Sequence, residues 1–102
     1  MYTVVVAQIT FSWDERKSTA NRRKHGVSFN EAQSVFVDER ALLAGDPDHS
    51  TDEARFVLLG MSAALRTLIV CHCYRDEDEV IRIISARKAT RSEQNAYRRG
   101  RL

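Results

Sequence analysis

The sequence has 102 residues, of which 43% are hydrophobic and 29% are charged, and its formal net charge is +2 at pH 7. This length predicts a single domain over residues 1–102, and the composition excludes collagen-like, low-complexity and linker-like chains. The longest apolar run is too short to cross a bilayer and the apolar N-terminus lacks a basic start, so we expect a cytoplasmic chain with reduced cysteines.

The first half of the chain predicts one strand and two helices. Tyr2–Phe11 is rich in β-branched and aromatic residues and predicts a strand. The first helix covers Glu15–His25, with Asp14 as its N-cap and Gly26 as its stop. Its Lys and Arg residues are spread over every face, so burial alone does not explain it. A second helix follows Ser28, where a capping-box pattern precedes an apolar stripe at helical spacing.

The second half predicts strands and a final helix. A short strand at Ala41–Ala44 and a turn-rich loop precede three longer strands, at Arg55–Met61, Leu65–Arg75 and Val80–Arg87. Their short connections predict an antiparallel meander. The last helix covers Arg91–Arg99 and opens with a second capping box. We therefore predict an α+β domain with two N-terminal helices, an antiparallel sheet of three to four strands and a C-terminal helix.

The charge is distributed unevenly along the chain. Residues 1–25 have a net charge of +3, residues 26–80 of −7 and residues 81–102 of +6. The positive charge of the two terminal segments favours a basic surface that binds a polyanion. The alternative is that the acidic middle of the chain only neutralises its two ends.

The last predicted strand carries the most informative charge. Strict alternation would place Arg82 on one face with Val80, Ile84 and Ala86. Burying an unpaired guanidinium is costly, so Arg82 predicts either a bound phosphate or an ion pair with a carboxylate from a helix. The spacing alone leaves both interpretations open.

Further cations flank this strand. Arg87, Lys88 and Arg91 lie where the strand ends and a helix begins, a place that favours anions, although a solvated basic surface would have the same sequence. His25 ends the basic first helix next to Lys24. It is a candidate general acid or base, and a helix-capping histidine is the alternative.

The central strand carries two further candidates and argues against a metal site. His72 and Tyr74 point to one face, whereas Cys71 and Cys73 point to the other. The histidine therefore points away from the cysteines, and no second ligand pair has zinc spacing. Small cysteines packed in the core are the favoured interpretation. His49, beside two aspartates, is interpreted as a loop cap, and no metal or other cofactor is expected.

Three blocks in order resemble the BrnT family of toxins. They are Trp13-Asp14 with Arg23-Lys24-His25-Gly26-Val27-Ser28-Phe29, then Asp46-Pro47-Asp48-His49-Ser50, and finally Ile81-Arg82-Ile83-Ile84-Ser85-Ala86-Arg87-Lys88-Ala89-Thr90. The resemblance covers about Phe11–Gly100. The chain departs from the pattern at Glu15, where proline is common, and at Arg22, where an apolar residue is common.

The resemblance implies a RelE-like fold, RNA cleavage without a metal, and a partner antitoxin, BrnA, that binds DNA through a ribbon-helix-helix domain. His25, Arg75, Arg82 and Arg87 fall on motif positions, whereas His72 and Tyr74 fall on less constant ones.

Together these observations predict an endoribonuclease toxin in which the ribose 2′-OH attacks its own phosphate. Arg75 and Arg82 would stabilise the developing charge, and His25, with His72 in reserve, would transfer the proton. The predicted RNA-binding residues are Lys24, Tyr74, Arg87, Lys88, Arg91 and Tyr97. The alternative is a non-catalytic module that binds nucleic acid or the antitoxin.

Overall fold

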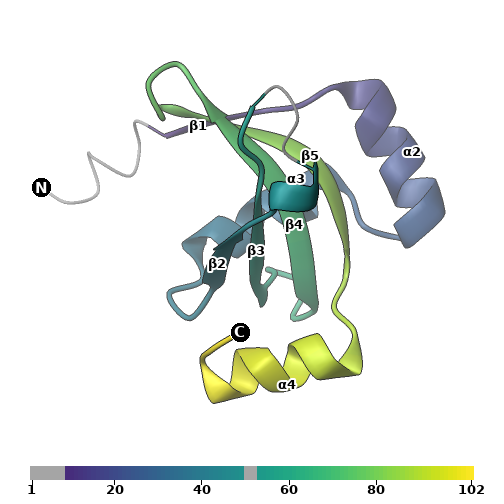
Figure 1. The fold of residues 1–102 in the computed structure, drawn as a ribbon. Coiled ribbons are helices and arrows are strands. Elements are labelled where there is room, and N and C mark those ends of the chain that lie inside the picture. Colours follow the sequence, from purple (N-terminus) through teal and green to yellow (C-terminus); the bar gives the residue numbers. More distant parts are fainter. Residues whose placement is uncertain (1–8, 50–52) are drawn as a thin grey trace, which may run out of the picture.

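The computed structural model describes residues 9–49 and 53–102, and in this part of the chain five strands form one mixed sheet in the order β1-β5-β4-β3-β2 (Figure 1). The strands are β1 (Thr10–Ser12), β2 (Leu42–Gly45), β3 (Phe56–Met61), β4 (Thr67–Arg75) and β5 (Val80–Lys88). β3, β4 and β5 form the predicted antiparallel meander, and β2 extends it.

The sheet differs from the prediction at its other edge. β1 pairs with β5 in parallel, through Thr10 to Ser12 alongside Val80 to Arg82. The sheet is therefore mixed rather than purely antiparallel. The predicted strand Tyr2–Phe11 agrees with the structure only at its end, since residues 1–8 lie outside the described residues.

The predicted α+β organisation with two N-terminal helices and a C-terminal helix is confirmed. The helices are α2 (Glu15–His25), α3 (Phe29–Gln33) and α4 (Arg91–Arg99), with 3-10 turns η1 (Ser34–Val37) and η2 (Pro47–His49). In the described residues no helix is long and apolar enough to span a membrane.

Local capping signals explain where the helices begin. The Asp14 side chain accepts from the backbone N–H of Arg16, and Ser28 does the same for Glu31. Thr90 and Glu93 form a complete capping box at the start of α4. These side chains satisfy N–H groups that have no partner within a helix.

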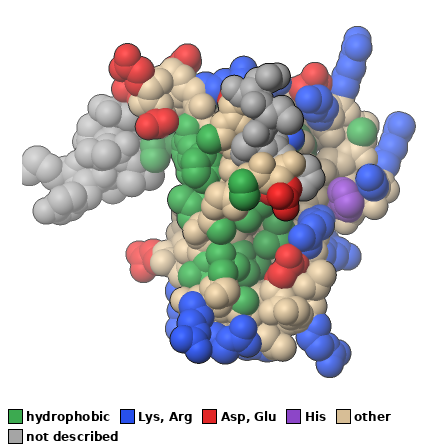
Figure 2. Space-filling view, in the orientation of Figure 1, with side chains coloured by type: hydrophobic (Ala, Val, Ile, Leu, Met, Phe, Trp, Pro, Cys, Tyr) green, Lys and Arg blue, Asp and Glu red, His purple; other side chains and the backbone are tan. Residues whose placement is uncertain are grey.

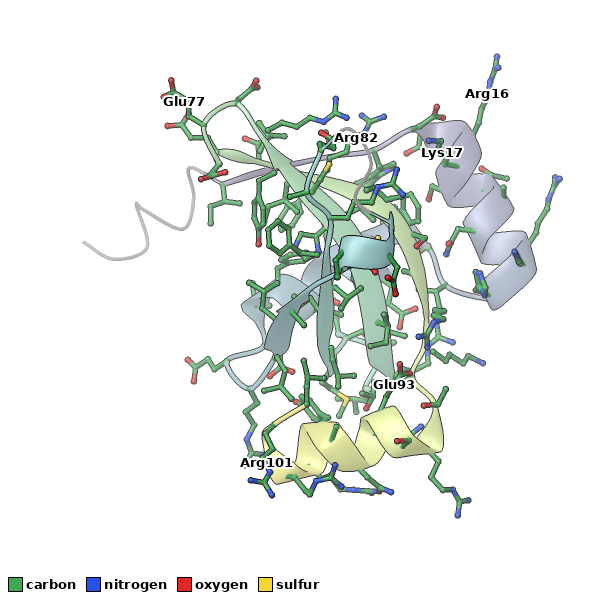
Figure 3. The ribbon with its side chains drawn as sticks, viewed as in Figure 1. Arg16, Lys17, Glu77, Arg82, Glu93 and Arg101 are labelled. Carbon is green, nitrogen blue, oxygen red and sulfur yellow. The ribbon has the colours of Figure 1, made fainter. Side chains whose placement is uncertain are left out.

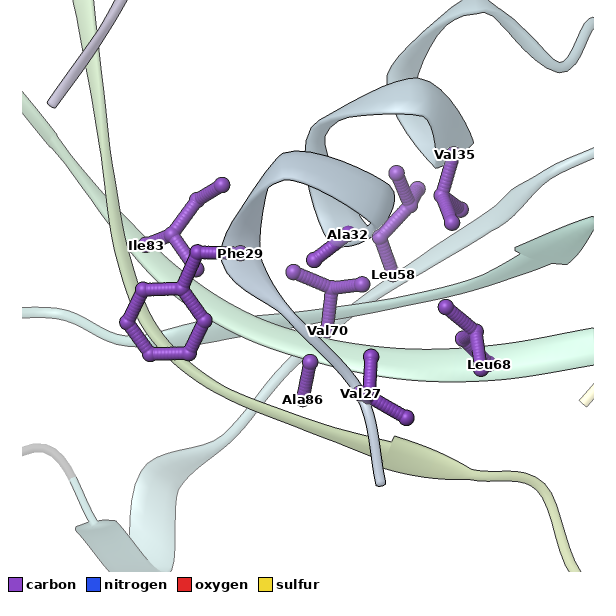
Figure 4. Packing of buried hydrophobic residues seen from close by; sticks show 9 residues of the cluster. All are labelled: Val27, Phe29, Ala32, Val35, Leu58, Leu68, Val70, Ile83 and Ala86. Atoms are coloured by element: carbon purple, nitrogen blue, oxygen red, sulfur yellow. The ribbon is translucent and has the colours of Figure 1, made fainter. Parts of the chain in front are cut away.

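The main core lies between the sheet and the segment that contains α3 (Figure 4). Val27, Phe29, Ala32 and Val35 are fully buried and pack on side chains from three strands, namely Leu58, Leu68, Val70, Ile83 and Ala86. α2 contributes almost nothing to this core, because Asn21 is its one buried residue.

A smaller core holds α4 against the opposite face at one end of the sheet (Figure 1). Ala96 and the partly buried Tyr97 pack against a cluster that includes Leu59, Ile69 and Ala89. Because α4 covers only this end, the rest of that face is left for side chains that reach solvent or line a pocket.

A β-bulge in β5 changes which side chains share a face. Cys71 pairs with Ser85, but His72 pairs with Ile83, so Ile84 is an extra residue in β5. The expectation from strict alternation that Ala86 lies on the face of Arg82 is therefore wrong: Ala86 lies in the main core. The same shift brings Arg82 and Arg87 to one face.

Candidate active site

Asn21 attaches the polar helix α2 to the edge of the sheet. β1 covers only the first part of β5, so the backbone of Ala86 faces α2 rather than a strand. The Asn21 Nδ2 donates to the Ala86 carbonyl (2.8 Å) and to the Val27 carbonyl (2.8 Å), and the Ala86 N–H donates to Asn21 Oδ1 (3.1 Å). One side chain thus replaces the missing strand partner and explains why an otherwise polar helix packs here.

His25 lies one helical turn after Asn21 and on the same side of α2. It lines a pocket of about 260 Å³ on the face of the sheet opposite the main core. The other lining residues come from β3, β4, β5 and the loop after β2, and they are Asp46, Arg55, Val57, Ile69, Cys71, Ile84, Ser85, Ala86 and Arg87. An imidazole, two guanidinium groups, a carboxylate, a thiol and a hydroxyl therefore surround an apolar floor.

Arg87 is held in place by an ion pair with the first turn of α4. Its guanidinium donates to both oxygens of Glu93, at 2.8 and 2.9 Å. The hydrogen bond from Arg87 is the main reason that the pKa of Glu93 falls to about 2. The pair fixes the direction of one cation at the pocket wall, and it also joins α4 to β5.

Two more arginines extend this face toward the end of the sheet remote from α4 (Figure 3). Arg82 lies across from Cys73, and no hydrogen bond or ion pair joins its guanidinium to the described residues. Arg75 donates to Glu53 at 3.0 Å, in an exposed pair. Of the two arginines, Arg82 is thus the one available to an anion.

Two of the predicted residues lie on the opposite face, as the alternation indicated. His72 is fully buried among Phe36, Phe56 and Tyr74, and its ring nitrogens face the Val70 carbonyl and the Tyr74 hydroxyl. Burial lowers the pKa of His72. The sheet separates both residues from His25, so we leave them out of the site.

The remaining predicted residues are distributed around the molecule. Lys24, Lys88 and Arg91 are exposed, and none of them lines the pocket. Tyr97 lies on α4, where its hydroxyl donates to Asp38 at 2.6 Å. This hydrogen bond is the main cause of a raised pKa of Tyr97. In the described residues, His, Cys, Asp and Glu form no group of three that could hold a metal ion.

Comparison with known proteins places this chain in one family. The sequence model that describes the ribonuclease toxin BrnT of type II toxin–antitoxin systems matches residues 13–93. The chain belongs to the BrnT family. The ribonuclease toxin BrnT of Brucella abortus has a similar structure, with a TM-score of 0.62 and 24% identity over 81% of this chain and 99% of that one. No curated protein matches the sequence.

The BrnT match spans His25, Arg75, Arg82 and Arg87, whereas the last part of α4 follows it. Sequence reasoning missed Asn21, because its partners lie six and 65 residues away. One signal was present: Asn is a poor helix former in mid-helix unless its side chain has a use. It also missed Arg55 and Ser85, which only the folded sheet brings beside His25.

Proposed function

We propose that this BrnT chain is an endoribonuclease that cleaves RNA without a metal, at the pocket between α2 and β5. The observation that carries the proposal is the placement of His25 beside Ser85 and Arg87, on the face that also presents Arg82. An imidazole and several fixed cations suit proton transfer at a phosphate.

In the proposed reaction the ribose 2′-oxygen attacks the neighbouring phosphorus and the bond to the 5′-oxygen breaks. The products are a cyclic phosphate and a 5′-hydroxyl, and no water or redox partner is consumed. His25 transfers the proton, as base to the 2′-OH or as acid to the leaving oxygen. Arg82 stabilises the charge that builds on the phosphate, while Arg87, held by Glu93, and Arg75, held by Glu53, add to the positive field from fixed positions.

The proposed biological setting is the cytoplasm, with a DNA-binding antitoxin of the BrnA kind as partner. Membership of a family of type II toxins supports a protein antitoxin and an RNA substrate. Such a partner would neutralise the toxin by covering the pocket or its rim.

The decisive experiment incubates the purified protein with RNA in EDTA and maps the new ends. We expect cyclic phosphate and 5′-hydroxyl ends. His25→Ala should lower kcat by about 10²–10⁴-fold, the usual contribution of a general acid or base. Arg16→Ala is the matched control, because Arg16 is exposed on the same helix and points into solvent (Figure 3).

Two results would contradict the proposal. One is cleavage that stops in EDTA and returns with a divalent cation. The other is full activity of His25→Ala. If neither variant nor wild type cleaves RNA but all bind the antitoxin, the chain acts as an interaction module.

A further inference from the structure

A second cationic groove lies at the C-terminal end of α4, apart from the His25 pocket. It has a volume of about 490 Å³ and shares no lining residue with that pocket. One wall comes from α4 and the other from the segment before β2, and its lining residues are Glu39, Arg40, Ala41, Leu42, Tyr97, Arg98, Arg99 and Gly100. Figure 2 shows Lys and Arg side chains gathered at this lower end of the molecule, below a hydrophobic area.

Among the described residues, no hydrogen bond or ion pair joins the guanidinium groups of the three arginines of the groove to a carboxylate. Arg98 donates to the Asn95 side chain, and no ion pair engages Arg40 or Arg99. The nearby Asp38 carboxylate already accepts from the N–H groups of Arg40 and Met61 and from the Tyr97 hydroxyl. In the described residues, Arg98 and Arg99 therefore have no carboxylate hydrogen-bond partner, whereas Arg40 lies near the Asp38 carboxylate and Glu39 also lines the groove.

These arginines are not needed to cap α4. The backbone N–H of Gly100 donates to the carbonyls of Ala96 and Tyr97, and the N–H of Arg101 donates to Ala96 as well. Gly100 adopts the left-handed conformation usual at a helix end. The backbone thus ends the helix by itself, and the side chains of Arg98 and Arg99 remain available to a ligand.

Tyr97 gives the groove a fixed aromatic wall. Its hydroxyl is held by Asp38 and its ring packs against the smaller core, so the ring has little freedom to turn. A rigid aromatic ring beside guanidinium groups is the combination that binds single-stranded nucleic acid, through base stacking and phosphate contacts. An acidic peptide would use the charges but would gain less from the ring.

α4 connects this groove to the His25 pocket. The Arg87–Glu93 pair attaches the first turn of α4 beside that pocket, and Arg98 and Arg99 end the helix. At about 1.5 Å per residue, the path from Glu93 to Arg99 is about 9 Å, which a few nucleotides can span. Arg91 and Arg98, two turns apart, lie on one exposed side of α4 along this path.

We propose that the C-terminal groove binds single-stranded RNA a few nucleotides away from the cleaved linkage. Arg40, Arg98 and Arg99 contact its phosphates, and Tyr97 stacks on a base. The inference rests on the proposed ribonuclease function, which it extends to a second contact for the substrate. It predicts that long substrates bind more tightly than short ones.

The test compares two double variants that remove equal charge. The groove variant, Arg98→Ala/Arg99→Ala, removes two cations from the groove. The control variant, Arg16→Ala/Lys17→Ala, removes two exposed cations from the far end of α2 (Figure 3). The probes are a dinucleotide and a single-stranded RNA of about 12 nucleotides that contains it. We expect the groove variant to raise KM for the longer RNA about tenfold, with kcat and dinucleotide cleavage unchanged.

Binding of the labelled longer RNA separates this proposal from the catalytic one. The slope of log affinity against log salt should become shallower by about 1.4 in the groove variant, the value for two lost phosphate contacts on a single strand. This change in slope is expected even if His25→Ala retains activity, so the groove proposal and the catalytic proposal can fail separately. The groove proposal is overturned if both double variants bind RNA equally, or if the groove variant loses affinity only for the antitoxin.

Discussion

Replacement of Asn21 tests the link between the fold and the site most directly. In Asn21→Ala the carbonyls of Val27 and Ala86 and the N–H of Ala86 lose their partner. Three hydrogen bonds at about 1 kcal/mol each predict a loss of about 3 kcal/mol in the free energy of unfolding. For a domain of this size, such a loss lowers the thermal midpoint by about 10–20 °C.

The same substitution should affect catalysis below the melting transition. Without Asn21, little holds α2 against β5, since no other residue of this helix is buried. His25 would then occupy the pocket for a smaller fraction of the time. We expect kcat to fall in the folded protein, while KM for long RNA changes little because the C-terminal groove is untouched.

Urea denaturation and steady-state cleavage, measured on the same preparations, check both effects. Asn30→Ala is the control, because Asn30 is exposed on α3. The reasoning is refuted if Asn21→Ala unfolds within about 0.5 kcal/mol of the wild type, the usual range for a surface substitution. Unchanged kcat in a clearly destabilised variant would show that α2 docks without Asn21.

Two further predictions concern packing and pH. In Gly60→Ala the new Cβ would lie 2.8 Å from Val35 Cγ1, so we expect the free energy of unfolding, measured by urea denaturation, to fall by about 1–3 kcal/mol. Gly45→Ala is the control and should cost little, because nothing lies within 4 Å of its new Cβ. Equal stabilities of the two variants would contradict this prediction. The pKa of Glu93, about 2 in the fold, is depressed from 4.5, so its ion pair with Arg87 stabilises the protein fully above pH 4.5 and is lost as the pH falls toward 2. Glu93→Gln should lower the free energy of unfolding by about 2 kcal/mol at pH 7. It should also flatten the decline of stability between pH 4.5 and 2. If the variant declines as steeply as the wild type, the Glu93–Arg87 pair does not cause the decline.

Features set by neighbouring residues could be predicted from the sequence. The caps at Asp14, Ser28 and Thr90 and the stops at Gly26 and Gly100 each depend on contacts within a few residues, and all are present. The meander followed from alternation and short turns. The parallel pairing of β1 with β5 could not be predicted in this way, because it joins segments about 70 residues apart and β1 is only three residues long.

The candidate site was predictable only in part, because most of it depends on contacts across the chain. Glu31 illustrates this: its position fits a capping-box pattern, but its carboxylate forms an ion pair with Arg66 from the turn before β4. This pair lowers the pKa of Glu31 and attaches α3 to the sheet. Similarly, His72 was a candidate because of its residue type, and only the fold shows that aromatic rings enclose it.

The extra residue in β5 gives the spacing of its arginines a meaning of its own. Arg82 and Arg87 are separated by an odd number of positions, which in a regular strand would direct one of them into the main core. Deleting Ile84 would remove the bulge and leave Arg82 and Arg87 four positions apart, a separation that a regular strand also places on one face. With Ile84 present, the bulge therefore decides on which side of the sheet Arg87 lies, independently of how many arginines the chain carries.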